Sequence, residues 1–380
     1  MRINEFLTKC EISAPMLRRG SMNGWRKMLT AAMLLASTSG ACLAQWAGTQ
    51  DAFLPSPVRT ISTVPAIGDV NPYGVAFVPN NFITGSGQLK HGDILVSNFN
   101  NSANVQGTGT TIVRVPAIGP LRVFFEDSKT PGLSTALGTL EYGFVVVGTC
   151  PDIPSTQAAG LPGALLVINN RGQLVQTFTN KWIQAPWDMA LIDRGDKAIA
   201  FVANALNGTI ARLNFNVSSS GLTLQSATTI ASGYVNRPDP VTFFVAPTGL
   251  VYDSALDLLY VASTGDNAVF AVPNALTRKK DAGMGFIVYD DNVHLHGPLG
   301  LAAAPNGHLL VTNNDGINPD PNQPSEIVEF TKQGDFVKEI SVDPAQGGSF
   351  GLAVSSSNGQ SIFAAVDDNT GTLMIWTLPE

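Results

Sequence analysis

The stretch Pro298-Leu299-Gly300-Leu301-Ala302, then Asn306-Gly307, then His308-Leu309-Leu310-Val311-Thr312 decides the fold of this chain. It continues through Asn313-Asn314-Asp315-Gly316 to Glu326-Ile327-Val328-Glu329-Phe330. Short apolar runs separated by Gly, Asn and Asp are typical of β-strands joined by tight turns. The stretch therefore predicts three successive short strands, and its pattern recurs along the chain.

The repeats begin at six similar tripeptides, each with Pro or a small residue first and Gly third. Asp replaces this Gly once. These tripeptides, called anchors below, are Pro72-Tyr73-Gly74, Ala136-Leu137-Gly138, Pro186-Trp187-Asp188, Pro247-Thr248-Gly249, Pro298-Leu299-Gly300 and Ser349-Phe350-Gly351. Successive anchors lie 50 to 64 residues apart. A repeat of about 50 residues with turn-rich insertions is typical of propeller blades rather than of solenoid turns.

Each repeat predicts four strands. In the third repeat they are Trp187–Leu191, Ala198–Ala203, Thr209–Phe215 and Leu222–Ile230. The sixth repeat ends with its third strand, Leu373–Leu378, and a spare strand, Val58–Val64, precedes the first anchor. Pairing the two would leave no open sheet edge where the ring closes. We therefore predict an all-β, six-bladed β-propeller over residues 58–380. It would have four antiparallel strands per blade, and the N-terminal strand would close the last blade.

Residues 1–44 have the composition of a secretory signal peptide. A positive region contains Arg18, Arg19, Arg26 and Lys27, and the apolar run Met28–Ala36 follows it. Small residues favour cleavage after Ala44. The apolar run is far shorter than the ~20 residues that span a bilayer. Residues 45–57 would then be a lead-in, and the mature protein would be secreted or periplasmic.

Three features of this segment leave alternatives open. Its positive region is long, so translation could start at Met1, Met16 or Met22. The Arg18-Arg19 pair could direct twin-arginine export, although the residues after it fit that signal poorly. Cys42 could carry a lipid anchor, although Ser39 stands where an aliphatic residue is expected.

The composition also restricts the partners. Charged residues make up 13% of the chain, and the net charge is −7. The largest basic cluster after residue 44, Arg278-Lys279-Lys280, is too small for a nucleic-acid surface. Cleavage after Ala44 would leave Cys150 as the single cysteine, so no intramolecular disulfide is expected. We expect a monomer that binds no nucleic acid and does not span a membrane.

The repeat pattern is Pro-x-Gly-[Leu/Val]-Ala, a Gly turn, [Leu/Ile]-x-Val-[Ala/Ser/Thr], and then Asn or Asp before a third strand. It resembles the NHL-repeat group of six-bladed propellers over most of residues 58–380. Two positions depart from the group: the Asp after the second strand is often Asn, Ser or Thr, and the Arg that opens the third strand is largely absent. The resemblance implies the propeller fold and leaves the activity open.

The first two strands of each blade run antiparallel, so the anchors and the loops after the second strands should surround one mouth of the central channel. The polar residues expected there are Asn98, Asn100, Asn101, Asp188, Asn204, Asn207, Asp266, Asn267, Asn313, Asn314, Asp315, Asp367, Asp368 and Asn369. Such residues suit tight turns, and as a group they could also offer oxygen ligands. Tyr73, Trp187 and Phe350 would form an aromatic rim for stacking on a sugar or peptide, or would pack between blades.

The leading functional hypothesis is a noncatalytic binding module that takes a protein, peptide or glycan at this mouth. Its ligand-binding candidates are Tyr73, Trp187, Asp188, Asn204, Asp266, Asn313, Phe350 and Asp367.

The alternative is a metal-dependent hydrolase or lactonase. Gluconolactonase/regucalcin-like propellers hold a metal on this face with Glu, Asn and Asp, and the resemblance implies a possible Ca²⁺ site formed by Asp188, Asn204, Asn313 and Asp367. No Glu occupies an anchor, and Asp188 would be the candidate catalytic residue. A zinc lyase of the amidating type is not expected, because only His294 and His296 precede an anchor on this face.

Overall fold

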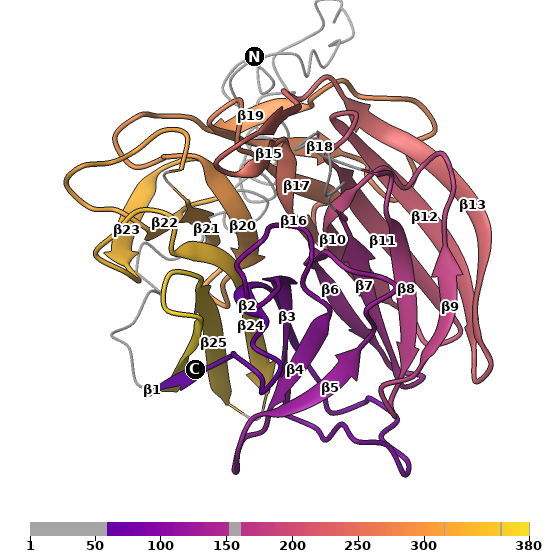
Figure 1. The fold of residues 1–380 in the computed structure, drawn as a ribbon. Helices are drawn as coiled ribbons and strands as arrows, with labels where there is room; N and C mark the ends of the chain where they lie inside the picture. Colours follow the sequence, from indigo (N-terminus) through magenta and orange to yellow (C-terminus); the bar gives the residue numbers. More distant parts are fainter. Residues whose placement is uncertain (1–58, 152–160, 315, 358, 380) are drawn as a thin grey trace, which may run out of the picture.

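Six four-stranded antiparallel sheets surround a central channel (Figure 1). The computed structural model describes residues 59–379 apart from 152–160, 315 and 358. The first strand of each sheet packs against the first strand of the next sheet, and that of the sixth sheet packs against that of the first. The predicted six-bladed β-propeller is therefore confirmed, and hydrophobic clusters fill the spaces between neighbouring blades.

The strands of the six blades, in blade order, are β2 (Val70–Phe77), β3 (Ile94–Asn100), β4 (Thr111–Val115) and β5 (Arg122–Glu126); β6 (Leu133–Leu140), β7 (Phe144–Thr149), β8 (Ala164–Asn169) and β9 (Leu174–Phe178); β10 (Pro186–Asp193), β11 (Lys197–Asn204), β12 (Thr209–Ser218) and β13 (Gly221–Ser232); β16 (Pro247–Asp253), β17 (Leu258–Ser263), β18 (Ala268–Pro273) and β19 (Phe286–Tyr289); β20 (Pro298–Ala303), β21 (Leu309–Asn313), β22 (Glu326–Phe330) and β23 (Phe336–Ser341); and β24 (Ser349–Ser357), β25 (Gln360–Asp367), β26 (Thr372–Pro379) and β1 (Arg59–Ser62).

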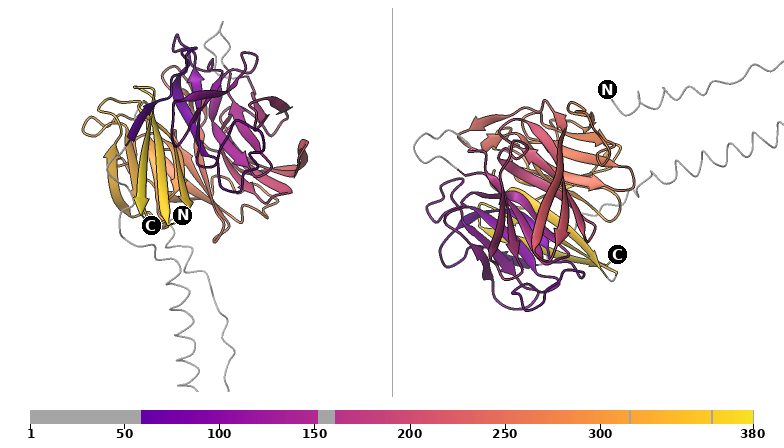
Figure 2. Two further views of the ribbon diagram at one scale, coloured as in Figure 1. Left: turned by 90° about the horizontal axis from the view of Figure 1, so that it is seen from below. Right: turned by 90° about the vertical axis from the view of Figure 1, so that its right-hand side faces the viewer.

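The ring is closed by both ends of the described chain. Strand β1 pairs antiparallel with β26, with Arg59 opposite Ile375 and Ser62 opposite Thr372. Figure 2 shows the two strands side by side in the sixth blade. The predicted closing strand is thus confirmed, although it is shorter than Val58–Val64. Val58, the predicted signal peptide 1–44 and the lead-in 45–57 lie outside the described residues.

Each first strand has a bulge at its anchor, where the pairing register with the second strand shifts. The pairing register shows that the third anchor residue of the second blade was predicted two residues too late in the chain. After the bulge, Val75 pairs with Val96, two residues before the partner of Pro72, and Leu137 pairs with Val147, two residues before the partner of Leu133. Ala136, and not Gly138, therefore occupies the position of Gly74. The bulge in blade 2 is one residue longer, from Leu133 to Leu137.

The anchor glycines allow neighbouring first strands to approach closely. A Cβ atom at Gly300 would lie 2.5 Å from the Phe350 carbonyl oxygen, and one at Gly351 would lie 1.7 Å from that of Tyr73. Both distances are shorter than a carbon–oxygen contact allows. Asp188 occupies the same position in blade 3, and its side chain bridges to blade 4 because Oδ2 accepts a hydrogen bond from Leu250 N at 3.0 Å.

Buried hydroxyl groups also connect one blade to the next. Thr312 Oγ1 accepts from Gly300 N at 2.6 Å and donates to the Phe350 carbonyl at 2.6 Å. Ser97, at the equivalent place in blade 1, accepts from Gly74 N at 2.9 Å and donates to Ser134 O at 2.8 Å. Both side chains are fully buried. Each hydroxyl therefore satisfies the anchor amide of its own blade and a carbonyl of the following blade.

One hairpin was not predicted. Strands β14 (Arg237–Asp239) and β15 (Phe243–Val245) pair with each other between the third and fourth blades. Phe243 has a φ of +65°, a left-handed conformation that a bulky residue rarely adopts. The hairpin ends at Val245, just before β16, the first strand of the fourth blade. No helix in the described part of the chain is long and apolar enough to cross a membrane.

The hydroxyl contacts give the first prediction. We expect Thr312→Val to lower the free energy of unfolding by about 1–3 kcal/mol, because it leaves the buried Gly300 amide without an acceptor. Thr312→Ser keeps the hydroxyl and should lose only about 1 kcal/mol, through the missing methyl group. Urea denaturation of the two variants measures both values. Equal losses in the two variants would assign the effect to packing instead.

Candidate functional site

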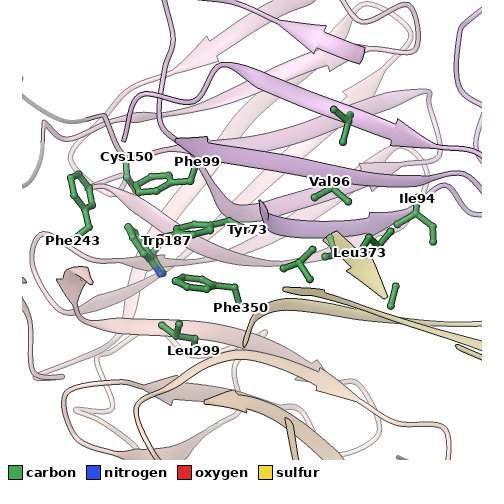
Figure 3. Close-up of a cluster of buried hydrophobic side chains, with 14 of the residues drawn as sticks. Tyr73, Ile94, Val96, Phe99, Cys150, Trp187, Phe243, Leu299, Phe350 and Leu373 are labelled. Carbon is green, nitrogen blue, oxygen red and sulfur yellow. The ribbon is translucent and has the colours of Figure 1, made fainter. Parts of the chain in front are cut away.

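A cluster of aromatic rings closes the central channel (Figure 3). This aromatic plug consists of Tyr73, Phe99, Trp187, Phe243, Phe244 and Phe350, all of them buried. Tyr73 stacks between Phe99 and Phe350, with ring centroids 4.4 Å and 4.1 Å away. The Trp187 ring meets Tyr73 edge-on at 5.8 Å. The rings pack on one another, which is the second of the two arrangements that the sequence left open, while Tyr73 and Phe350 also line a pocket described below.

The plug divides the channel into two compartments. The first strands run from one mouth of the channel to the other. Along these strands, Tyr73, Trp187 and Phe350 each lie directly before the third residue of an anchor, which is the position of Gly300 and Gly351 in their blades. A pocket of about 430 Å³ lies on the side where the first strands begin. A cavity of about 610 Å³ lies on the side toward which they run. We call them the loop-face pocket and the turn-face cavity.

The loop-face pocket is polar. It is lined by Asn71, Tyr73, Asn100, Asn104, Gln106, Val241, Thr242, Asn314, Gly316, Gln346, Gly347, Phe350, Asp368 and Asn369. The tip of the β14–β15 hairpin forms one wall, and Gln106 Nε2 donates to Val241 O across the mouth at 2.9 Å. Among these described residues there is no Lys, Arg or His. The pocket therefore offers amide groups and one carboxyl group above an aromatic floor.

Asp368 is the carboxyl group of this pocket. Burial raises its pKa well above the ordinary value, and the nearby Asp367 and Asp343 carboxylates raise it further. Tyr73 lies within reach of this charge. Burial and then the Asp368 charge raise the pKa of Tyr73, while a hydrogen bond from the Asn71 side chain opposes the shift. A carboxyl group and a neutral phenol therefore face the same polar space.

Two amide oxygens at the pocket have no partner. Asn71 Oδ1 and Asn100 Oδ1 are both buried without a hydrogen bond in the described part of the chain. The two side chains are 8% and 1% exposed. Asn100 is held in place because its Nδ2 donates to Asn104 Oδ1 at 2.7 Å. Buried unpaired oxygens are costly, so these two atoms are suited to a bound donor or cation.

The four residues predicted to hold a metal do not share a pocket. Asn204 Oδ1 accepts from Gln184 N at 2.9 Å, and its Nδ2 donates to Trp182 O at 3.1 Å. Asp367 accepts from Thr370 and from Asn369 N. Asn313 Nδ2 donates to the His294 carbonyl at 2.7 Å, and its Oδ1 is unpaired. Asn204, Asn313 and Asp367 occupy the same place, opposite the first residue of an anchor, and fasten the adjoining loops.

Asp188 lies in the other compartment. It lines the turn-face cavity, where Oδ1 accepts from Met189 N at 2.7 Å and Oδ2 accepts from Leu250 N. Burial raises its pKa to about 7, although both hydrogen bonds favour the charged form. Asp188 therefore lines the turn-face cavity, whereas the other three predicted metal ligands do not.

The remaining candidates have local partners. Asp266 Oδ2 accepts from Ser263 Oγ at 2.6 Å and from Val235 N at 3.1 Å. His294 Nδ1 lies 2.9 Å from Glu339 Oε2, and His296 Nδ1 lies 3.1 Å from Asn318 O. No group of three or more His, Cys, Asp or Glu side chains in the described residues is arranged to hold a metal ion. Asp266 does not line either compartment.

Sequence reasoning noticed Asp368 among the polar loop residues but did not single it out, and it missed Asn71. Asn71 directly precedes the anchor Pro72, in a left-handed conformation with a φ of +61°. A non-glycine residue held in this region is a signal of a local constraint, but it is visible only in the structure.

Comparison with solved structures supports the fold. A gluconolactonase from Xanthomonas campestris superposes with a TM-score of 0.51 at 11% identity, covering 84% of this chain and 89% of that chain. A luciferin-regenerating enzyme gives 0.50 at 12%, covering 86% and 96%. A third structure, described as a putative glucose dehydrogenase from Thermus thermophilus, gives 0.48 at 14%, covering 84% and 99%.

No family model matches the sequence, and no curated protein matches it. The resemblance to the NHL-repeat group therefore stays a prediction. At these identities the first two structures show a shared propeller fold.

The raised pKa of Asp188 gives a prediction for stability. Its folded pKa of about 7 lies above the unfolded value of 3.8, so the folded protein binds more protons and loses stability as the pH rises between these values. One such group contributes a slope of at most about 1.4 kcal/mol per pH unit. We expect the stability of Asp188→Asn, relative to the native protein, to increase from about pH 4 to about pH 7. Urea denaturation across this range measures it, and a pH-independent difference would contradict it.

Proposed function

We propose that the protein is a hydrolase that binds a small polyhydroxylated lactone in the loop-face pocket and opens its ring. The observation that carries this proposal is the desolvated Asp368 carboxyl group, which lines the same pocket of amide side chains as Tyr73 and acts electrostatically on its hydroxyl. A raised pKa suits a carboxylate for proton transfer near neutral pH.

The two groups have complementary roles. Asp368 accepts a proton from water as the water oxygen attacks the lactone carbonyl carbon. The Tyr73 hydroxyl, kept neutral by its raised pKa, donates a hydrogen bond to the carbonyl oxygen as negative charge develops on it. When the ring carbon–oxygen bond breaks, Asp368 returns the proton to the leaving oxygen, and the product is the hydroxy acid. The amide side chains of the pocket orient the substrate hydroxyl groups.

A Ca²⁺ ion would fit the same pocket. Asn71 Oδ1, Asn100 Oδ1 and an oxygen of Asp368 are hard ligands, and the two amide oxygens lack partners in the described chain. When bound, the ion would polarise the lactone carbonyl. This set replaces the four ligands expected from the sequence, which do not share a pocket.

The comparisons lend support, because the Xanthomonas protein with the same fold is described as a gluconolactonase. Noncatalytic binding of a glycan or peptide is the second candidate. It is favoured by the lining itself, in which amide side chains outnumber the single carboxyl group. Secretion, which would present either function outside the cytoplasm, remains a prediction from residues 1–44.

Turnover of glucono-δ-lactone tests the proposal, measured as proton release with added Ca²⁺ or with a chelator. We expect Asp368→Asn to lower kcat/KM by at least about 100-fold, which is the usual contribution of a general base. The amide has nearly the same shape, so the fold should be kept, and thermal melting verifies this.

Asp335→Asn is the matched control, because Asp335 is another turn carboxylate and lies outside the loop-face pocket. Its activity should equal that of the native protein. Calorimetric binding of the lactone or its hydroxy acid without proton release would support the second candidate and overturn the hydrolase. Unchanged turnover in Asp368→Asn would remove Asp368 from the reaction.

A further inference from the structure

We propose that the turn-face cavity is a second ligand site, and that it takes a primary aliphatic amine whose ammonium group pairs with Asp188. The site is independent of the loop-face pocket, because the aromatic plug lies between them. Its volume of about 610 Å³ is in the range of small-molecule sites.

The walls of the cavity combine aliphatic side chains with polar groups of the first strands. The first strands of several blades contribute Val75, Leu137, Leu250, Leu301 and Leu352 to the lining. None of the described lining residues is aromatic except Tyr252. Methylene groups that lie against these side chains are removed from water, which favours binding of an alkyl chain.

Asp188 gives the cavity its charge preference. No Lys, Arg or His lies among the described lining residues, so the Asp188 carboxylate has no cation to pair with. The backbone amides of Met189 and Leu250 each occupy one lone pair of its oxygens. A carboxylate can accept about four hydrogen bonds, so about two positions remain for a donor. An ammonium group supplies both the donors and the missing positive charge.

The backbone reinforces this preference. Each first strand is the terminal strand of its sheet, so its channel-facing edge carries backbone groups that no neighbouring strand pairs with. The carbonyl oxygens on this edge can accept the remaining ammonium protons. A carboxylate ligand would instead meet Asp188 and Asp193, which both line the cavity. The site should therefore discriminate by charge between ligands of the same length.

Calorimetry on the full chain tests the proposal with hexylamine, hexanol and hexanoate at about pH 8. We expect hexylamine to bind at least about tenfold more tightly than hexanol, and hexanoate more weakly than either. In Asp188→Asn the advantage of the amine over the alcohol should fall below about twofold. Nα-acetyl-lysinamide, run alongside, distinguishes a lysine side chain from a free amine as the source of the ammonium group.

Two further variants keep the test decisive. Asp193→Asn is the matched control, because the Asp193 carboxylate lines the same cavity but is the last residue of β10, whereas Asp188 directly follows the plug residue Trp187. Ala303→Trp places a bulky side chain at an exposed lining position and should abolish binding without disturbing the core. Equal binding of amine and alcohol, an equal effect of Asp193→Asn, or tight binding to Ala303→Trp would each overturn the proposal. Loss of lactone turnover has no bearing on it.

Discussion

The close approach of six first strands around one axis is the constraint on which the rest of this structure depends. Where glycine stands at the anchor, as at Gly300 and Gly351, the next blade's carbonyl lies where a side chain would be. Buried hydroxyls at Ser97 and Thr312 then satisfy the anchor amides and reach across to the following blade. Backbone contact and side-chain hydrogen bonds therefore hold the ring at its narrowest part.

The same constraint explains the two compartments. The middle residue of three anchors is a large aromatic residue, and these three residues, Tyr73, Trp187 and Phe350, belong to one buried cluster. With Phe99 and the hairpin residues Phe243 and Phe244, these rings fill the channel at one level. The space on either side is left open, and the two spaces differ in character. One is lined largely by amide side chains, and the other by aliphatic residues together with two carboxyl groups.

The fold could be predicted from the sequence because strand length, turn residues and anchor spacing are all local. The second anchor was misplaced because Gly138 matches the tripeptide pattern, while the longer bulge that moves the position to Ala136 depends on pairing with β7. The sequence left open whether the three aromatic residues stack on a ligand or pack together, because alternation along a strand does not tell whether rings meet a ligand or one another. Asn100, Asn314, Asp368 and Asn369, which the sequence placed at this mouth, do line the loop-face pocket. Asn71 was missed because the burial of its unpaired oxygen is visible only in the folded chain.

Strand β1 has a consequence for the order in which the molecule can form. Its partner, β26, lies more than 300 residues later, with Arg59 opposite Ile375. Such a contact has a high entropic barrier and is among the slowest to be made. During synthesis, five sheets can assemble from their own sequence, but the sixth cannot be completed until β26 has left the ribosome. Until then the unpaired edge of the sixth sheet and the apolar surface beside it are exposed and can associate with other chains. We therefore expect a chaperone to act on the nascent chain at the site where β1 pairs with β26.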